Sequence, residues 1–124
     1  MDELSALAKE NPRKRMNKDL RTTSNDQSQR MLNALEPGTV VPIHRHTKST
    51  ETLVVLRGRI VERYYNDNGE VVEEICMFPN GNVPMISIPV GQWHDLICQE
   101  SGTVIYESKD GAYEPISDND ILKI

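Results

Sequence analysis

Residues 38–58 read GTVVPIHRHTKSTETLVVLRG and hold two of the three histidines in this 124-residue chain. His44 and His46 are one residue apart, and Glu51 follows five residues after His46. On a β-strand, residues i and i+2 point to the same face, so both imidazoles would enter one interior. Glu51 is at odd spacing and joins them only if a turn or bulge intervenes, for which the polar residues 47–50 are suited. The spacing therefore predicts two nitrogens and one carboxylate converging from neighbouring strands.

The third histidine, His94, follows a turn signal at residues 89–91 and supplies a fourth group. A lone histidine on a turn is usually a structural polar residue, but this is the only histidine left to complete the set formed by His44, His46 and Glu51. Three imidazoles and a carboxylate suit a divalent transition metal: Fe, Mn, Ni, Cu or Zn. An octahedral ion would keep open positions for water or a substrate.

Two motifs then carry a resemblance to the cupin superfamily. The first is matched by Gly38, His44, His46, Glu51 and Gly58, and the second by Pro89, Gly91 and His94. Val83 and Cys98 depart from the second motif, where cupins have glycine and asparagine.

A narrower resemblance, to the WbuC-type cupins, rests on the runs NPRKRMN (11–17), QRMLNALEPG (29–38), His44–His46 and GQWH (91–94). It extends from about Asn11 to Tyr113. It implies an all-β fold, namely a cupin-type antiparallel β-barrel (jelly-roll), with a metal bound by the three histidines and the glutamate. It also implies a role in O-antigen or surface-polysaccharide synthesis, without defining a reaction.

The hydrophobic pattern predicts short strands separated by turns, which favours a sandwich or barrel. We expect a short helix at 2–10 and strands at 30–35, 52–56, 59–65, 71–78, 85–88, 95–98 and 103–107, with a tight hairpin at 66–69. This divides the chain into an N-terminal helix and basic arm (1–26), a cupin β-barrel (27–114) and a C-terminal tail (115–124).

The net charge of −5 argues against a nucleic-acid partner. Residues 9–21 are nevertheless basic, and either form a solvated arm or hold an anion. In the second case Arg13 and Arg15 fold over the barrel mouth, because guanidinium groups pair with phosphate or carboxylate. Further candidate ligand contacts are Arg30, which otherwise supports the surface, Trp93, which otherwise packs at the core edge, and Tyr106, a candidate hydroxyl donor.

Neither a signal peptide nor an apolar run of membrane-spanning length is visible, so we expect a cytoplasmic protein without a membrane partner. Cys76 and Cys98 lie in apolar runs and are expected to be buried free thiols. Cupin edges are commonly covered by pairing, which predicts a homodimer.

Several functions remain open at this point. The first is metal-dependent chemistry on a small anionic or sugar-derived ligand, of an isomerase, epimerase or oxygenase type. The second is a metal-free sugar-nucleotide isomerase or epimerase that uses His44 or His46 for proton transfer. The third is a non-catalytic ligand-binding or sensor module.

Overall fold

The computed structural model describes residues 1–123 and is built almost entirely from strands. The elements in chain order are α1 (Asp2–Glu10), β1 (Arg15–Asp19), β2 (Ser28–Leu35), β3 (Glu51–Arg57), β4 (Ile60–Tyr65), β5 (Val71–Met77), β6 (Met85–Ile88), β7 (Trp93–Cys98), β8 (Thr103–Asp110) and a 3-10 helix η1 (Asp118–Asp120).

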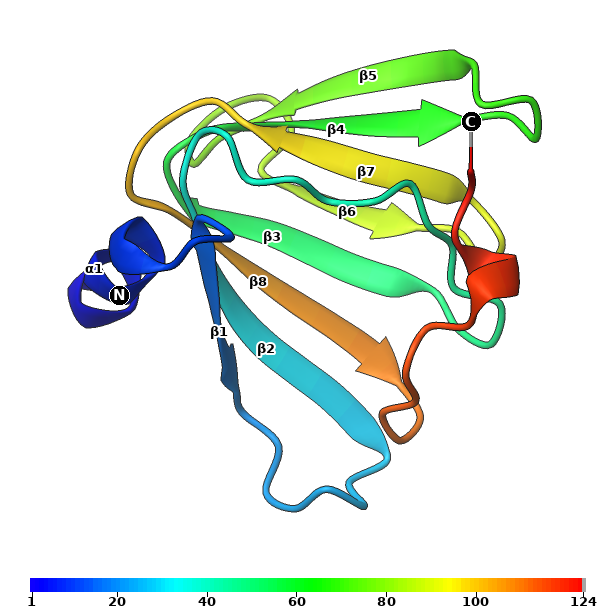
Figure 1. The fold of residues 1–124 in the computed structure, drawn as a ribbon, viewed down its shortest axis with the longest axis horizontal. Helices are drawn as coiled ribbons and strands as arrows, with labels where there is room; N and C mark the ends of the chain where they lie inside the picture. The colour runs from blue at the N-terminus through cyan, green and yellow to red at the C-terminus, as the bar shows by residue number, and fades with distance from the viewer. Residues whose placement is uncertain (124) are drawn as a thin grey trace.

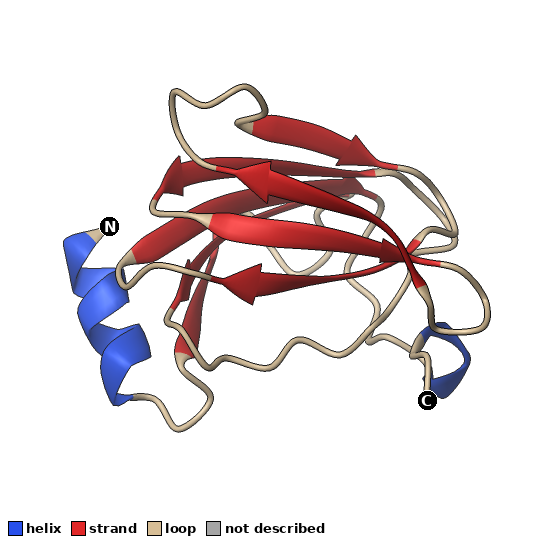
Figure 2. Ribbon diagram, turned by 90° about the horizontal axis from the view of Figure 1, so that it is seen from above, coloured by secondary structure: helices blue, strands red, loops and turns tan. Residues whose placement is uncertain are grey.

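The strands form two antiparallel sheets that face each other (Figure 1). The larger sheet has the order β1-β2-β8-β3-β6, and the smaller one has the order β5-β4-β7. The all-β cupin-type fold is confirmed, but the two sheets are not closed into a continuous barrel. The termini lie at opposite ends of the sandwich (Figure 2).

Helix α1 was expected at residues 2–10 and forms there, on the outer face of the larger sheet (Figure 2). Its Ala8 is fully buried against Ala34 of β2 and Val104 of β8. Acidic Asp2 and Glu3 occupy the first turn, where their negative charges interact favourably with the positive end of the helix dipole. The helix therefore covers an apolar patch that the sheet would otherwise expose.

The basic arm is more ordered than the sequence suggested, because residues 15–19 form the edge strand β1. Arg15 pairs with Leu35 and Asp19 pairs with Met31, in an antiparallel register with β2. The arm thus belongs to the larger sheet and brings its arginines to a fixed side of the molecule.

The apolar core lies between the sheets. It consists of Leu35, Leu53, Val55, Ile60, Met77, Ile88, Leu96, Cys98 and Ile105. Cys98 is buried as expected, whereas Cys76 on the edge strand β5 is exposed, which corrects that part of the prediction. Within residues 1–123, no helix combines the length and apolar character that crossing a bilayer requires.

Gly58 joins β3 to β4 with a φ of +84°, a conformation that side chains other than glycine rarely adopt. A Cβ atom there would lie 2.7 Å from the Cα of Thr103. Glycine is therefore required at this turn for both its backbone conformation and its small size.

Candidate metal centre

His44 lies in an irregular segment, residues 36–50, not on the strand that the His-x-His spacing predicted. The segment still runs beside β7, because the backbones of His44 and His94 exchange two hydrogen bonds, of 3.0 and 2.8 Å. The Gly91 amide also donates to the His46 carbonyl at 2.8 Å. These bonds hold His44 opposite His94 without a regular strand.

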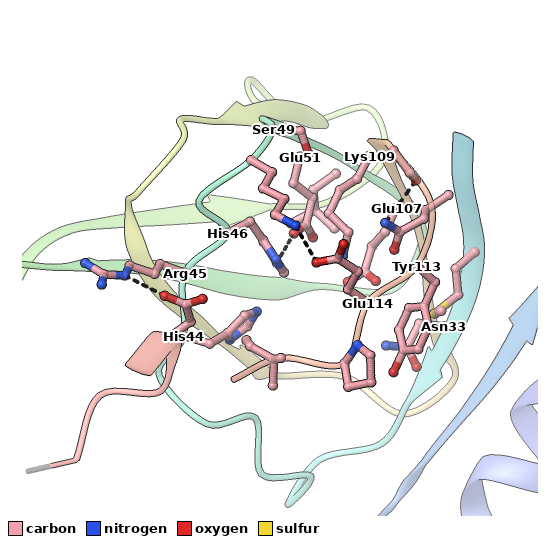
Figure 3. Close-up of a pocket in the computed structure, with 18 of the residues that line it drawn as sticks. Asn33, His44, Arg45, His46, Ser49, Glu51, Glu107, Lys109, Tyr113 and Glu114 are labelled. Carbon is pink, nitrogen blue, oxygen red and sulfur yellow. Dashed lines mark hydrogen bonds and ion pairs between the residues drawn. The ribbon is translucent and has the colours of Figure 1, made fainter. Parts of the chain in front are cut away.

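Glu51 begins β3 of the larger sheet, and His94 belongs to β7 of the smaller one. The ligand atoms of His44, His46, Glu51 and His94 all lie within 4.8 Å of one another. The His46 Nε2 is 2.8 Å from the Glu51 Oε2, and the His94 Nε2 is 3.8 Å from the same oxygen. Both sheets and the intervening segment thus contribute to one cluster (Figure 3).

The second ring nitrogens orient the imidazoles. The Nδ1 of His44 lies 2.8 Å from the Pro42 carbonyl, and the Nδ1 of His94 lies 2.9 Å from the Gln92 carbonyl. A carbonyl only accepts, so each Nδ1 carries the proton and each Nε2 keeps a free lone pair. This is the tautomer that a metal-binding histidine needs.

An unpartnered buried nitrogen and the spacing of the donor atoms both suit a bound cation. The His94 Nε2 is buried, and no hydrogen-bond partner within the described residues satisfies it. Unpaired buried polar atoms are costly, and a cation among four donors removes that cost. Opposite ligands on a transition-metal ion with bonds of roughly 2.0–2.2 Å are roughly 4.0–4.4 Å apart, so donor atoms within 4.8 Å of one another need to move inward only slightly to bind one ion.

The charge states suit metal binding as well. Burial, reinforced by His94, lowers the pKa of His44 to about 4, and burial also lowers the pKa of His94. Burial opposes ionisation of Glu51, but the hydrogen bond from His46 and the charge of Lys109 bring its pKa down to about 2. At neutral pH the site therefore offers two neutral imidazoles and a carboxylate.

The cluster opens into a cavity of about 1080 Å³. Arg13, Arg15 and Arg30, predicted as ligand contacts, all line this cavity. The guanidinium of Arg30 is already paired with Asp26 at 2.9 Å. Arg13 and Arg15 form no ion pair with any described residue.

Trp93 and Tyr106 are not among the residues that line the cavity. Trp93 precedes the cavity-facing His94 on β7, so its side chain points to the other face of the sheet. There its indole nitrogen donates to Asp67 at 2.9 Å, and the guanidinium of Arg45 stacks on its ring. Tyr106 follows the core residue Ile105 and likewise points outward. Their placement gives no support to a role in ligand binding.

Further polar residues that line the cavity include Asn33, Glu62, Glu107 and Lys109, of which the last three were not singled out from the sequence. Asn33, Glu107 and Lys109 lie on the right-hand side of Figure 3, across the cavity from His44. Each alternates with residues of the opposite face along its strand. That alternation was the signal available in the sequence, but it did not reveal which face was the interior.

The fold and the site together define a cupin-fold protein with a candidate metal centre. Similar solved structures include oxalate oxidase bound to the substrate analogue glycolate, at 15% identity and a TM-score of 0.67, where 87% of this chain covers 56% of that chain. The Cnp3 cupin domain of Schizosaccharomyces pombe is 11% identical with a TM-score of 0.62, covering 78% and 64% of the two chains. The capsular polysaccharide assembling protein CapF of Staphylococcus aureus is 23% identical with a TM-score of 0.60, covering 80% and 29%.

In sequence, residues 1–77 match the family described as "Domain of unknown function (DUF6016)", and the chain belongs to that family. No curated protein matches the sequence. The chain spans little more than half the length of the oxalate oxidase that it resembles in fold.

Proposed function

We propose that this protein is a WbuC-type cupin metalloprotein that acts on a small anionic or sugar-derived ligand in O-antigen or surface-polysaccharide metabolism. The observation that carries the proposal is the cluster of His44, His46, Glu51 and His94 on the wall of a cavity that also presents Arg13 and Arg15. The structural similarity to a capsular polysaccharide assembling protein supports the same biological setting.

A divalent metal bound here would act as a Lewis acid that polarises an oxygen of the ligand. His44 and His46 would hold the ion from the segment 36–50, His94 from the smaller sheet and Glu51 from the larger sheet. Leu53, two residues after Glu51 on the same face, borders the cavity and limits access of water. Arg13 and Arg15 attract and orient the negative group of the ligand.

The metal-free isomerase reading is less well supported by the geometry. A histidine that transfers protons at neutral pH needs a pKa near 7, and the pKa of His44 is about 4. Metal-free proton transfer also does not require the complete set of three histidines and a carboxylate that converge here. The metal-binding reading uses all four residues.

The decisive test is metal analysis of protein purified without a histidine tag. We expect His46→Ala to reduce bound metal at least tenfold, because it removes one of three imidazoles. Lys48→Ala is the matched control. In the sequence Lys48 lies between His46 and Glu51, but its side chain is exposed and paired with Glu114. Full metal occupancy in His46→Ala protein would show that the ligand assignment is wrong.

A homodimer in the cytoplasm completes the proposal. The supporting observation is the apolar surface on the edge strands β5 and β6, where Val71, Val72 and Met85 are exposed. Light scattering at micromolar concentration measures the oligomeric state directly.

A further inference from the structure

The register of the larger sheet separates the arginines from the metal cluster by a long distance. Glu51 pairs with Lys109 on β8, whereas Arg15 pairs with Leu35, which pairs with Thr103 on β8. The two positions are therefore three strand spacings and six residues apart. Along the sheet this is a path of roughly 20–25 Å between their Cα atoms, and the curvature of the sheet and the long side chains shorten the gap across the cavity.

One single small anion cannot contact both ends of this cavity. A phosphate ion or a short dicarboxylate is far smaller than the separation, even when the side chains extend toward each other. If one ligand uses the metal and the arginines together, it must be elongated.

The anionic end of such a ligand is best placed at Arg13 and Arg15. The other arginines near the cavity are neutralised, because Arg21 pairs with Asp19 and Arg30 pairs with Asp26. The Nε of Arg15 is buried and has no hydrogen-bond partner within residues 1–123. This donor is therefore available to a phosphate oxygen.

The stretch between the two ends presents an acceptor. Asn33 is 4% exposed, and its Oδ1 lacks a hydrogen-bond partner within the described part of the chain. Its neighbours in register are Ile105, which is in the core, and Asn17, which also lines the cavity. An amide oxygen only accepts hydrogen bonds, so its partner must be a donor such as a hydroxyl group.

We infer that the ligand is a hydroxyl-bearing phosphate ester at least as long as a hexose 1-phosphate, with its sugar at the metal, a hydroxyl group at Asn33 and its phosphate at Arg13 and Arg15. The inference rests on the proposed function and specifies its ligand class. It distinguishes this cavity from one built for a short acid or a free sugar.

Isothermal titration calorimetry on metal-loaded protein tests it, with glucose 1-phosphate, UDP-glucose and GDP-mannose as probes. We expect at least one of them to bind tenfold or more tightly than glucose or inorganic phosphate, because only a sugar joined to a phosphate reaches both ends. Metal content is measured on the same samples. If the metal is present and none of the three exceeds glucose and phosphate, the inference is overturned while the proposed metal centre stands. An absence of metal would instead overturn the proposed function.

Variants then assign the two contacts. Arg15→Ala should weaken binding of the best probe about tenfold, because it removes a charged hydrogen bond. Lys18→Ala is its matched control, since Lys18 is an exposed cation on the same strand. Equal effects of the two substitutions would overturn the anionic end.

Asn33→Leu should weaken the same probe about three- to tenfold, because it removes one neutral hydrogen bond. Binding of inorganic phosphate should not change. Asn33→Ala serves as a second variant if the leucine disturbs the fold, which circular dichroism checks. Unchanged affinity of the probe in a folded Asn33 variant would overturn the hydroxyl contact.

Discussion

Glu62 is the carboxyl group that fits least well into the interior as an ion. It is fully buried on the inner face of β4, and neither of its oxygens has a hydrogen-bond partner within the described residues. In register it pairs with Leu96, which lies two residues after His94 on the same face of β7. Glu62 is thus a diagonal neighbour of a candidate metal ligand, and its protonation state affects the electrostatics of the site.

The pKa of Glu62 gives a direct prediction about stability. Burial, followed by the charges of Glu51, Glu107 and Asp95, raises this pKa well above the usual 4.5. The folded state then holds a proton that the unfolded chain releases, so stability falls as pH rises above 4.5 toward the folded-state pKa. Glu62→Gln removes this loss. The melting temperature of the variant minus that of the wild type should therefore be several degrees higher at pH 8 than at pH 5. Thermal unfolding of metal-free protein at both pH values measures it. A difference independent of pH would mean that Glu62 ionises normally.

At the level of single residues, the ligand cluster was predictable and its environment was not. The spacing brought His44, His46 and Glu51 together, His94 was the one remaining histidine, and the resemblance to the cupin motifs joined all four. Glu62 resembles any polar residue on an alternating strand. Only the pairing of β4 with β7 shows that its side chain faces inward.

Among the elements, β1 and the segment around His44 differ most from expectation. β1 has no apolar alternation, because its inner face borders a polar cavity and its outer face is largely exposed. His44 reaches β7 through two backbone hydrogen bonds, although no regular strand forms there. Both features depend on partners distant in sequence, which local patterns do not encode, whereas the helix and the central strands carry strong local patterns.

The turn between β3 and β4 tests how strictly the fold constrains an element boundary. Gly58→Ala should destabilise the protein by roughly 2–4 kcal/mol, because it adds a clash with Thr103 to the strain of a positive φ. Gly102→Ala is the matched control: its φ is +80°, but nothing lies within 4 Å of the added Cβ. It should lose only about 1–2 kcal/mol from the backbone strain. Urea unfolding gives both values, and equal losses would show that the contact with Thr103 relaxes freely.

On the scale of the whole molecule, the candidate metal centre joins parts that are otherwise held separately. The larger and smaller sheets are not hydrogen-bonded to each other as strands, and the core provides most of the contact between them. Glu51 comes from the larger sheet, His94 from the smaller sheet, and His44 and His46 from the segment between. An ion bound by all four links both sheets across the sandwich.

Metal binding should therefore stabilise the entire fold and not only the loop that carries His46. An ion at about 100 times its dissociation constant adds about 2.7 kcal/mol to the free energy of unfolding. For a chain of this size, this corresponds to a rise in melting temperature of roughly 5–15 °C. Differential scanning calorimetry with and without a chelator measures the rise, and hydrogen exchange should show added protection in both β3 and β7. His46→Ala should reduce the response to metal strongly. If the metal protected only residues 44–51 and left β7 unchanged, His94 would not be a ligand and the link between the sheets would not exist.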